Sequence, residues 1–220
     1  MQLRASAVVA AVVLAARTAR ADATPQAGTD VGVGEMRSSL LNYYGGEEAS
    51  AYVIGGVGVA SVGAGAVLVT RSQDFSRGLG WPLLTLGALE VLGGAFYVVQ
   101  VRSEIHRYGD QLASNPTGYR DVEATHIAGT RRRFVYYRLG ELGLAVAGLA
   151  IATYGFAANR PTFEGVGVGG VSVGAPFLLI DTFNNARAGW YADRVRRFQP
   201  SIGLVPGPSG GLSVAVAGVL

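Results

Sequence analysis

The sequence predicts an all-α membrane protein with four transmembrane helices arranged as two hairpins, and three observations support this fold class. Half of the 220 residues are hydrophobic, and the mean hydropathy is +0.32. Residues 81–101 carry a single charge, and as a helix they would extend about 31 Å, the thickness of a bilayer's hydrocarbon core. Three further apolar segments occupy residues 50–70, 134–158 and 165–180. The expected partner of the chain is therefore a lipid bilayer.

The composition argues against several classes of function. The chain has no Cys, which excludes disulfides, thiolate metal sites and cysteine nucleophiles. Its net charge is only +3, and no stretch interleaves aromatic with basic residues, so we expect no nucleic-acid partner. The two histidines, His106 and His126, lack metal-ligand spacing, and no nucleophile–base pair is evident. We therefore expect neither an enzyme nor a bound cofactor or metal.

The first 23 residues have the pattern of a cleaved signal peptide. Arg4 precedes an apolar run at residues 5–16, and an A-x-A cleavage pattern follows at residues 21–23. The run is too short to cross a bilayer as a helix. We expect a bacterial inner-membrane protein with this signal removed. Residues 24–49 are polar and Gly-rich and are interpreted as a loose leader.

The first predicted hairpin spans residues 50–101. Its first segment has no charge, and the small residues Gly56, Ala60 and Ala64 recur at every fourth position. Such a face lets a neighbouring helix backbone approach closely in lipid. Glu47 and Glu48 fit the first turn of this helix, where acids interact favourably with the helix dipole.

The second segment of this hairpin contains the most informative residue, Glu90. A nine-residue turn precedes it, and Trp81 and Pro82 fit the start of a helix at the membrane interface. An ionisable side chain at mid-membrane is costly and is by default a candidate functional residue. Two interpretations remain open: a carboxyl that carries a proton or binds a cation, or a neutral acid hydrogen-bonded across helices, for example to Thr85, Tyr97 or Tyr154.

A polar connection is predicted at residues 102–133. Its first part, residues 103–112, is expected to extend the preceding helix into water, and residues 115–118 (Asn-Pro-Thr-Gly) are expected to break it. Three consecutive arginines end the connection, and we expect them to anchor the next helix and to contact anionic lipid headgroups. These arginines are Arg131, Arg132 and Arg133.

The second predicted hairpin spans residues 134–198. Residues 165–174 alternate Gly with apolar residues and suit either a strand or a helix; helix is preferred because the apolar run continues beyond them. Residues 199–220 form a tail, interpreted as two short strands around a Gly/Pro turn.

Polar residues of the second hairpin complete the candidate intramembrane site. Asp181, Asn184 and Asn185 share one helical face, which with Glu90 would line a polar cavity, or would mark where the helix leaves the lipid. Glu141 follows Arg138 by three residues, a spacing that suits an interfacial ion pair.

The two hairpins show signs of an internal repeat. The pattern Tyr43–Tyr44 with Glu48 returns 93 residues later, and Glu90 and Asp181 occupy roughly equivalent positions. Two hairpins duplicated in this way would be parallel repeats.

The orientation signals conflict. A cleaved signal would place three arginines of the hairpin turns in the cytoplasm and ten other arginines outside, which is the reverse of the positive-inside rule.

Two functions are compatible with this pattern. The first is a structural, scaffolding or accessory subunit that forms homo- or hetero-oligomers through its Gly-rich helix faces. The second is a small transporter or channel subunit that uses Glu90 and Asp181 for the passage of protons or cations. The discriminating observation is whether these two acids face one cavity.

Overall fold

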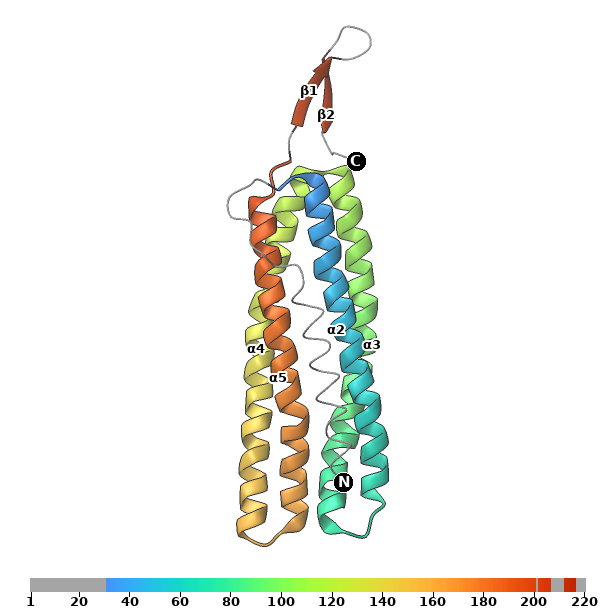
Figure 1. The fold of residues 1–220 in the computed structure, drawn as a ribbon, viewed down its shortest axis with the longest axis vertical. Helices are drawn as coiled ribbons and strands as arrows, with labels where there is room; N and C mark the ends of the chain where they lie inside the picture. Colours follow the sequence, from blue (N-terminus) through green and yellow to red (C-terminus); the bar gives the residue numbers. More distant parts are fainter. Residues whose placement is uncertain (1–30, 201, 207–211, 217–220) are drawn as a thin grey trace. The chain divides into compact units, whose positions relative to one another are not determined.

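The computed structural model describes residues 31–200, 202–206 and 212–216, and four long helices account for most of them (Figure 1). The all-α, four-helix prediction is confirmed. The predicted signal peptide and the first residues of the leader lie outside the described residues. The helices are α2 (Val33–Val69), α3 (Asp74–Ser114), α4 (Pro116–Ala157) and α5 (Pro161–Arg197).

The helices form two antiparallel hairpins, as expected. The most extensive contacts join α2 with α3 and α4 with α5, and contacts between α3 and α5 join the hairpins. Both hairpins begin at the same end of the helices, so they run in the same direction (Figure 1). This arrangement is the one that parallel repeats would have, while duplication itself stays a prediction.

Each helix is about twice as long as a bilayer requires. The helices contain 37 to 42 residues, or about 55 to 63 Å, against about 30 Å for the hydrocarbon core. All four contain an apolar window long enough to cross a membrane. We call residues 50–101 and 134–180 the membrane half, because they contain the apolar segments predicted from the sequence and the short hairpin turns between them. Residues 31–49, 102–133 and 181–200 form the bundle half.

Two expectations from the sequence are wrong in the bundle half. The loose leader is wrong for residues 33–49, which form the first turns of α2. The polar connection is likewise not a separate segment, because α3 continues to Ser114 and α4 starts at Pro116. Only Asn115 breaks the helix; its side-chain oxygen accepts a hydrogen bond from the Gly118 backbone N–H at 3.0 Å and so caps α4.

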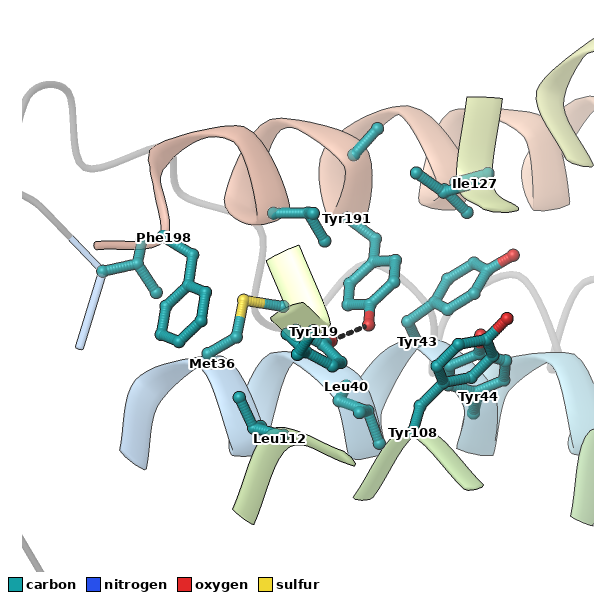
Figure 2. Packing of buried hydrophobic residues seen from close by; sticks show 14 of the residues in the cluster. Met36, Leu40, Tyr43, Tyr44, Tyr108, Leu112, Tyr119, Ile127, Tyr191 and Phe198 are labelled. Atoms are coloured by element: carbon teal, nitrogen blue, oxygen red, sulfur yellow. Dashed lines mark hydrogen bonds between the residues drawn. The ribbon is translucent and has the colours of Figure 1, made fainter. Parts of the chain in front are cut away.

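A tyrosine-rich core explains why these polar segments are ordered (Figure 2). The ring of Tyr43 stacks on that of Tyr191 with 4.4 Å between centroids. The hydroxyls of Tyr119 and Tyr191 are hydrogen-bonded at 2.6 Å, and Tyr44 stacks on Tyr108. The hydroxyls of Tyr44, Tyr119 and Tyr191 are hydrogen-bonded while the ring faces are buried, so the bundle half has a core of its own.

The membrane half is packed through glycines at seven-residue intervals. Gly58 of α2 faces Gly87 of α3, and Gly65 faces Gly80; in the second hairpin Gly148 faces Gly167. A Cβ atom on Gly58 would lie 2.8 Å from the Gly87 carbonyl oxygen, so the backbones are in direct contact. A seven-residue period is that of a left-handed coiled coil.

The expected face of Gly56, Ala60 and Ala64 is therefore not the contact face. All three are exposed, and a Cβ on Gly56 would meet nothing within 4 Å. The four-residue period identified small residues correctly but selected the wrong side of the helix.

At the hairpin turns, the helix ends differ from the expected ones in one place. The turn before α3 is short, and the helix begins at Asp74, so Pro82 lies inside it and not at its start. The α4–α5 turn ends α4 in a Schellman motif, in which Asn159 has φ 51° and the Arg160 N–H donates to the Gly155 carbonyl at 2.7 Å.

Two further predictions of secondary structure agree with the structure. Residues 165–174 are helical, within α5. In the tail, β1 (Ile202–Pro206) and β2 (Leu212–Val216) pair antiparallel, with Ile202 opposite Val216.

Candidate functional site: an acidic cavity between the hairpins

A cavity of about 910 Å³ lies between the two hairpins where the membrane half meets the bundle half. All four helices contribute to its wall. Of the predicted site residues, the cavity brings together Glu90 of α3, Glu141 of α4, and Asp181 and Asn184 of α5. Asn185 does not line it and is half-buried on the neighbouring side of α5.

Of these side chains, Glu90 is the one whose hydrogen-bonding capacity is least satisfied. Its side chain is 9% exposed, and neither carboxylate oxygen has a hydrogen-bond partner among the residues that the structure describes. The expected partners bond elsewhere: Thr85 donates to the Trp81 carbonyl, and Tyr97 donates to Glu47. The hydrogen-bonded interpretation of Glu90 is therefore wrong within the described chain.

Glu141 and Asp181 face each other across the α4–α5 pair. Their carboxyl groups interact with one another, and Arg138 is close enough to affect both electrostatically. The expected ion pair between Arg138 and Glu141 is not formed, because the Arg138 Nε donates to the Phe134 carbonyl instead. The two acids therefore share one side of the cavity wall.

Asn184 ties the cavity wall to the first hairpin. Its Oδ1 accepts a hydrogen bond from the Ser50 hydroxyl at 2.9 Å. The amide is buried, so this bond fixes α5 against α2 at the depth where the apolar segment of α2 begins.

Glu47 is a fourth acid of the cavity wall and is itself buried, which was not expected from the sequence. It lies in the middle of α2 and not in a first helical turn. Tyr97 donates a hydrogen bond to its Oε2, and Arg187 Nη1 lies 3.7 Å from its Oε1. The signal was present in the spacing, because Leu40, Glu47 and Ile54 are seven residues apart and lie on one face of α2.

Glu48 also lies within α2, on its outer side. It pairs with Arg102 of α3 at 2.8 Å, which links the two helices where the membrane half begins.

The rest of the cavity wall is mainly apolar and opens between two helices. The helices α3 and α4 make few contacts with each other. The lining residues Leu89 and Phe96 of α3, and Tyr136 and Tyr137 of α4, are exposed on the outer surface. The cavity therefore communicates with the lipid-facing side of the membrane half through the α3–α4 gap.

The polar rim of the cavity belongs to the bundle half. It includes Gln100, Glu104, His126 and Arg133, with His126 Nε2 3.8 Å from a Glu104 carboxylate oxygen. Within the described ranges, no group of three His, Asp or Glu side chains could hold a metal ion. Arg131 and Arg132 are exposed outside the cavity, and their contact with anionic lipid stays a prediction.

A second buried acid network lies beside the cavity, in the bundle half. Glu123 is fully buried, and the Tyr44 hydroxyl donates to its Oε1 at 2.9 Å. Burial raises the pKa of Glu123 to about 8, although its hydrogen bonds with Tyr44 and Tyr191 act in the opposite direction. This burial could not be predicted from the residues around Glu123, because the tyrosine partners come from α2 and α5.

Comparison with protein-family models, curated proteins and solved structures finds no match to this chain. The chemistry of the cavity therefore carries the functional argument alone. Five lining carboxyl groups face two basic side chains, Arg133 and His126, within the described wall. Such a site favours positively charged species.

Proposed function

We propose that this chain is an integral membrane protein that binds protons or cations at its acidic cavity and passes them along it. The observation that carries the proposal is Glu90, a buried carboxyl without a partner, on the wall that also holds Glu141 and Asp181. A buried polar group without a hydrogen bond costs free energy, and more so when ionised. A position of this kind is best explained by a proton or cation that occupies it.

The proposal is tested by measuring flux in proteoliposomes with an entrapped pH-sensitive dye and an imposed cation gradient. Glu90→Gln keeps the size and polarity of the side chain but removes its charge, so we expect flux to fall by roughly tenfold or more. Glu164→Gln is the matched control, because Glu164 lies in the first turn of α5 and does not line the cavity. Unchanged flux in a well-folded Glu90→Gln protein would overturn the proposal.

A second candidate function, an accessory or scaffolding subunit, is favoured by one observation. The exposed residues Gly56, Ala60, Gly63 and Ala64 form a small-residue face on α2 that no other described helix covers. Small residues of this kind support contact with another transmembrane helix. Leucines at Gly56 and Gly63 would then abolish an oligomer seen by light scattering in detergent, and an unchanged mass would exclude this face.

A further inference from the structure

The cavity is too large for a proton or a simple metal ion alone. Its volume of about 910 Å³ is at the upper end of the range for organic ligands, roughly 300 to 1,000 Å³. A bare ion near Glu90 would leave most of this space and most of the apolar wall without contact. The size therefore points to a molecule with a substantial apolar body.

The wall has the composition that such a molecule requires. Aliphatic and aromatic side chains surround the acids on α3, α4 and α5; they include Leu86, Leu144, Phe134, Phe177 and Val173. Aliphatic side chains gain from burial against an apolar ligand, and aromatic faces attract cations. The acids occupy only part of the wall, so one end of the ligand carries the charge.

The charge of the ligand follows from the same wall. Glu90 is nine-tenths buried, lines the cavity and lacks a hydrogen-bond partner in the described chain. The lining acids outnumber the two lining bases, as described above. An anionic ligand would be repelled and a neutral ligand would leave the charge of Glu90 uncompensated, whereas a cation would compensate it.

The opening indicates the route by which the ligand arrives. The α3–α4 gap lies among lipid-facing residues of the membrane half, where Leu89 and Phe96 are exposed. A molecule dissolved in the bilayer can pass through this gap without crossing the tyrosine-rich core of the bundle half.

We propose that the cavity binds hydrophobic organic cations that enter from the bilayer between α3 and α4, with the positive charge held at Glu90 and the apolar body against the aromatic and aliphatic wall. This inference rests on the proposed function, because the same carboxyl serves both, and it names the class of cargo.

Binding of radiolabelled tetraphenylphosphonium to the purified full-length chain in detergent tests the inference. We expect saturable binding that Glu90→Gln weakens by roughly tenfold, because a charge–charge contact in an apolar site is lost. Glu90→Asp should retain part of the affinity. Neutral triphenylphosphine oxide, which has similar rings and no net charge, should not displace the probe.

A second variant tests whether the apolar volume of the cavity holds the probe. Gly140 lines the cavity, and a Cβ placed there would meet nothing within 4 Å. Gly140→Phe should therefore fill the cavity, abolish tetraphenylphosphonium binding and leave the protein folded by circular dichroism and gel filtration.

Three results would overturn the inference. They are no saturable binding to a folded wild-type chain that retains Glu90-dependent flux, equal affinity in Glu90→Gln, or displacement by the neutral competitor. The first leaves the proposed function intact, whereas loss of Glu90-dependent flux with binding preserved would refute the proposed function alone.

Discussion

At the scale of single residues, Glu123 is the clearest case of a carboxyl whose protonation state changes on folding. The carboxyl is enclosed by Tyr44 and Tyr191, and the nearby charged groups Glu104 and Arg107 act on it in opposite directions. Burial dominates and raises its pKa from 4.5 to about 8. The folded bundle half therefore retains a proton that the unfolded chain releases at neutral pH.

This shift predicts how stability depends on pH. Stability from Glu123 is fully present below about pH 4.5 and is lost as pH rises through about 8, because the unfolded state binds fewer protons in that window. Glu123→Gln mimics the protonated form, so its thermal midpoint in detergent should fall less than that of the wild type between pH 6 and pH 9, values chosen to bracket neutrality.

Asp121→Asn supplies the control, because Asp121 is exposed on the same helix. It should keep the wild-type pH dependence. Parallel curves for wild type and Glu123→Gln would contradict the assignment.

Single residues also show which contacts of the site could be predicted from the sequence and which could not. The helical spacing of Asp181 and Asn184 was enough to place them on one face, and that face does line the cavity. The partners of Glu47 and Glu123 were not predictable, because they lie 50 and 79 residues away in the chain. Whether an acid is buried depends on such distant side chains, whereas the residues next to it in the sequence suggest that it is exposed to solvent.

At the scale of elements, the packing of each hairpin depends on which glycines face the partner helix. A Cβ on Gly65 would lie 2.6 Å from the Leu84 backbone nitrogen and 2.8 Å from the Gly80 carbonyl oxygen. Backbone atoms cannot move aside as a flexible side chain can, so the two helices would have to separate.

A pair of substitutions in α2 tests this packing. Gly65→Ala should destabilise the first hairpin by about 1 to 3 kcal/mol, as over-packing typically does. Gly63→Ala, two residues away with nothing within 4 Å of its Cβ, should be neutral or slightly stabilising. Thermal midpoints measured by tryptophan fluorescence in detergent compare the two, and equal values would contradict the assignment of the contact face.

The elements also show where periodicity succeeded and where it failed. Long apolar runs were enough to predict all four helices and their order. The polar residues 33–49 were assigned to a leader because their hydropathy is low. A seven-residue spacing links Tyr44 and Ala51 to Gly58, and it carried the information that hydropathy lacked.

At the scale of the whole molecule, the bundle half and the hairpin turns lie at opposite ends of the apolar windows. The positions Ser114, beside the α3–α4 break, and Ser72, in the first hairpin turn, are exposed at these two ends. A bilayer around the membrane half would separate them.

Single cysteines in this naturally Cys-free chain test that arrangement. Ser114→Cys and Ser72→Cys should react with a membrane-impermeant maleimide from opposite sides of sealed vesicles. A cleaved signal predicts the bundle half outside, and the positive-inside rule predicts it in the cytoplasm, so the same experiment decides between them. Labelling of both positions from one side would contradict a membrane-spanning fold.

The two ends of the hairpins are joined in different ways. In the bundle half, an ion pair between Glu35 and Arg194, a backbone bridge between Val31 and Phe198, and the single residue Asn115 hold them together. Near the turns they touch through closely approaching backbones at Gly78 and Thr162, and a Cβ on Gly169 would also lie 3.0 Å from the Pro82 side chain.

Separation of the hairpins would therefore disturb different contacts at the two ends. At the turn side it would break the close backbone packing of α3 against α5, whereas at the bundle half it would require the stacked tyrosines to come apart.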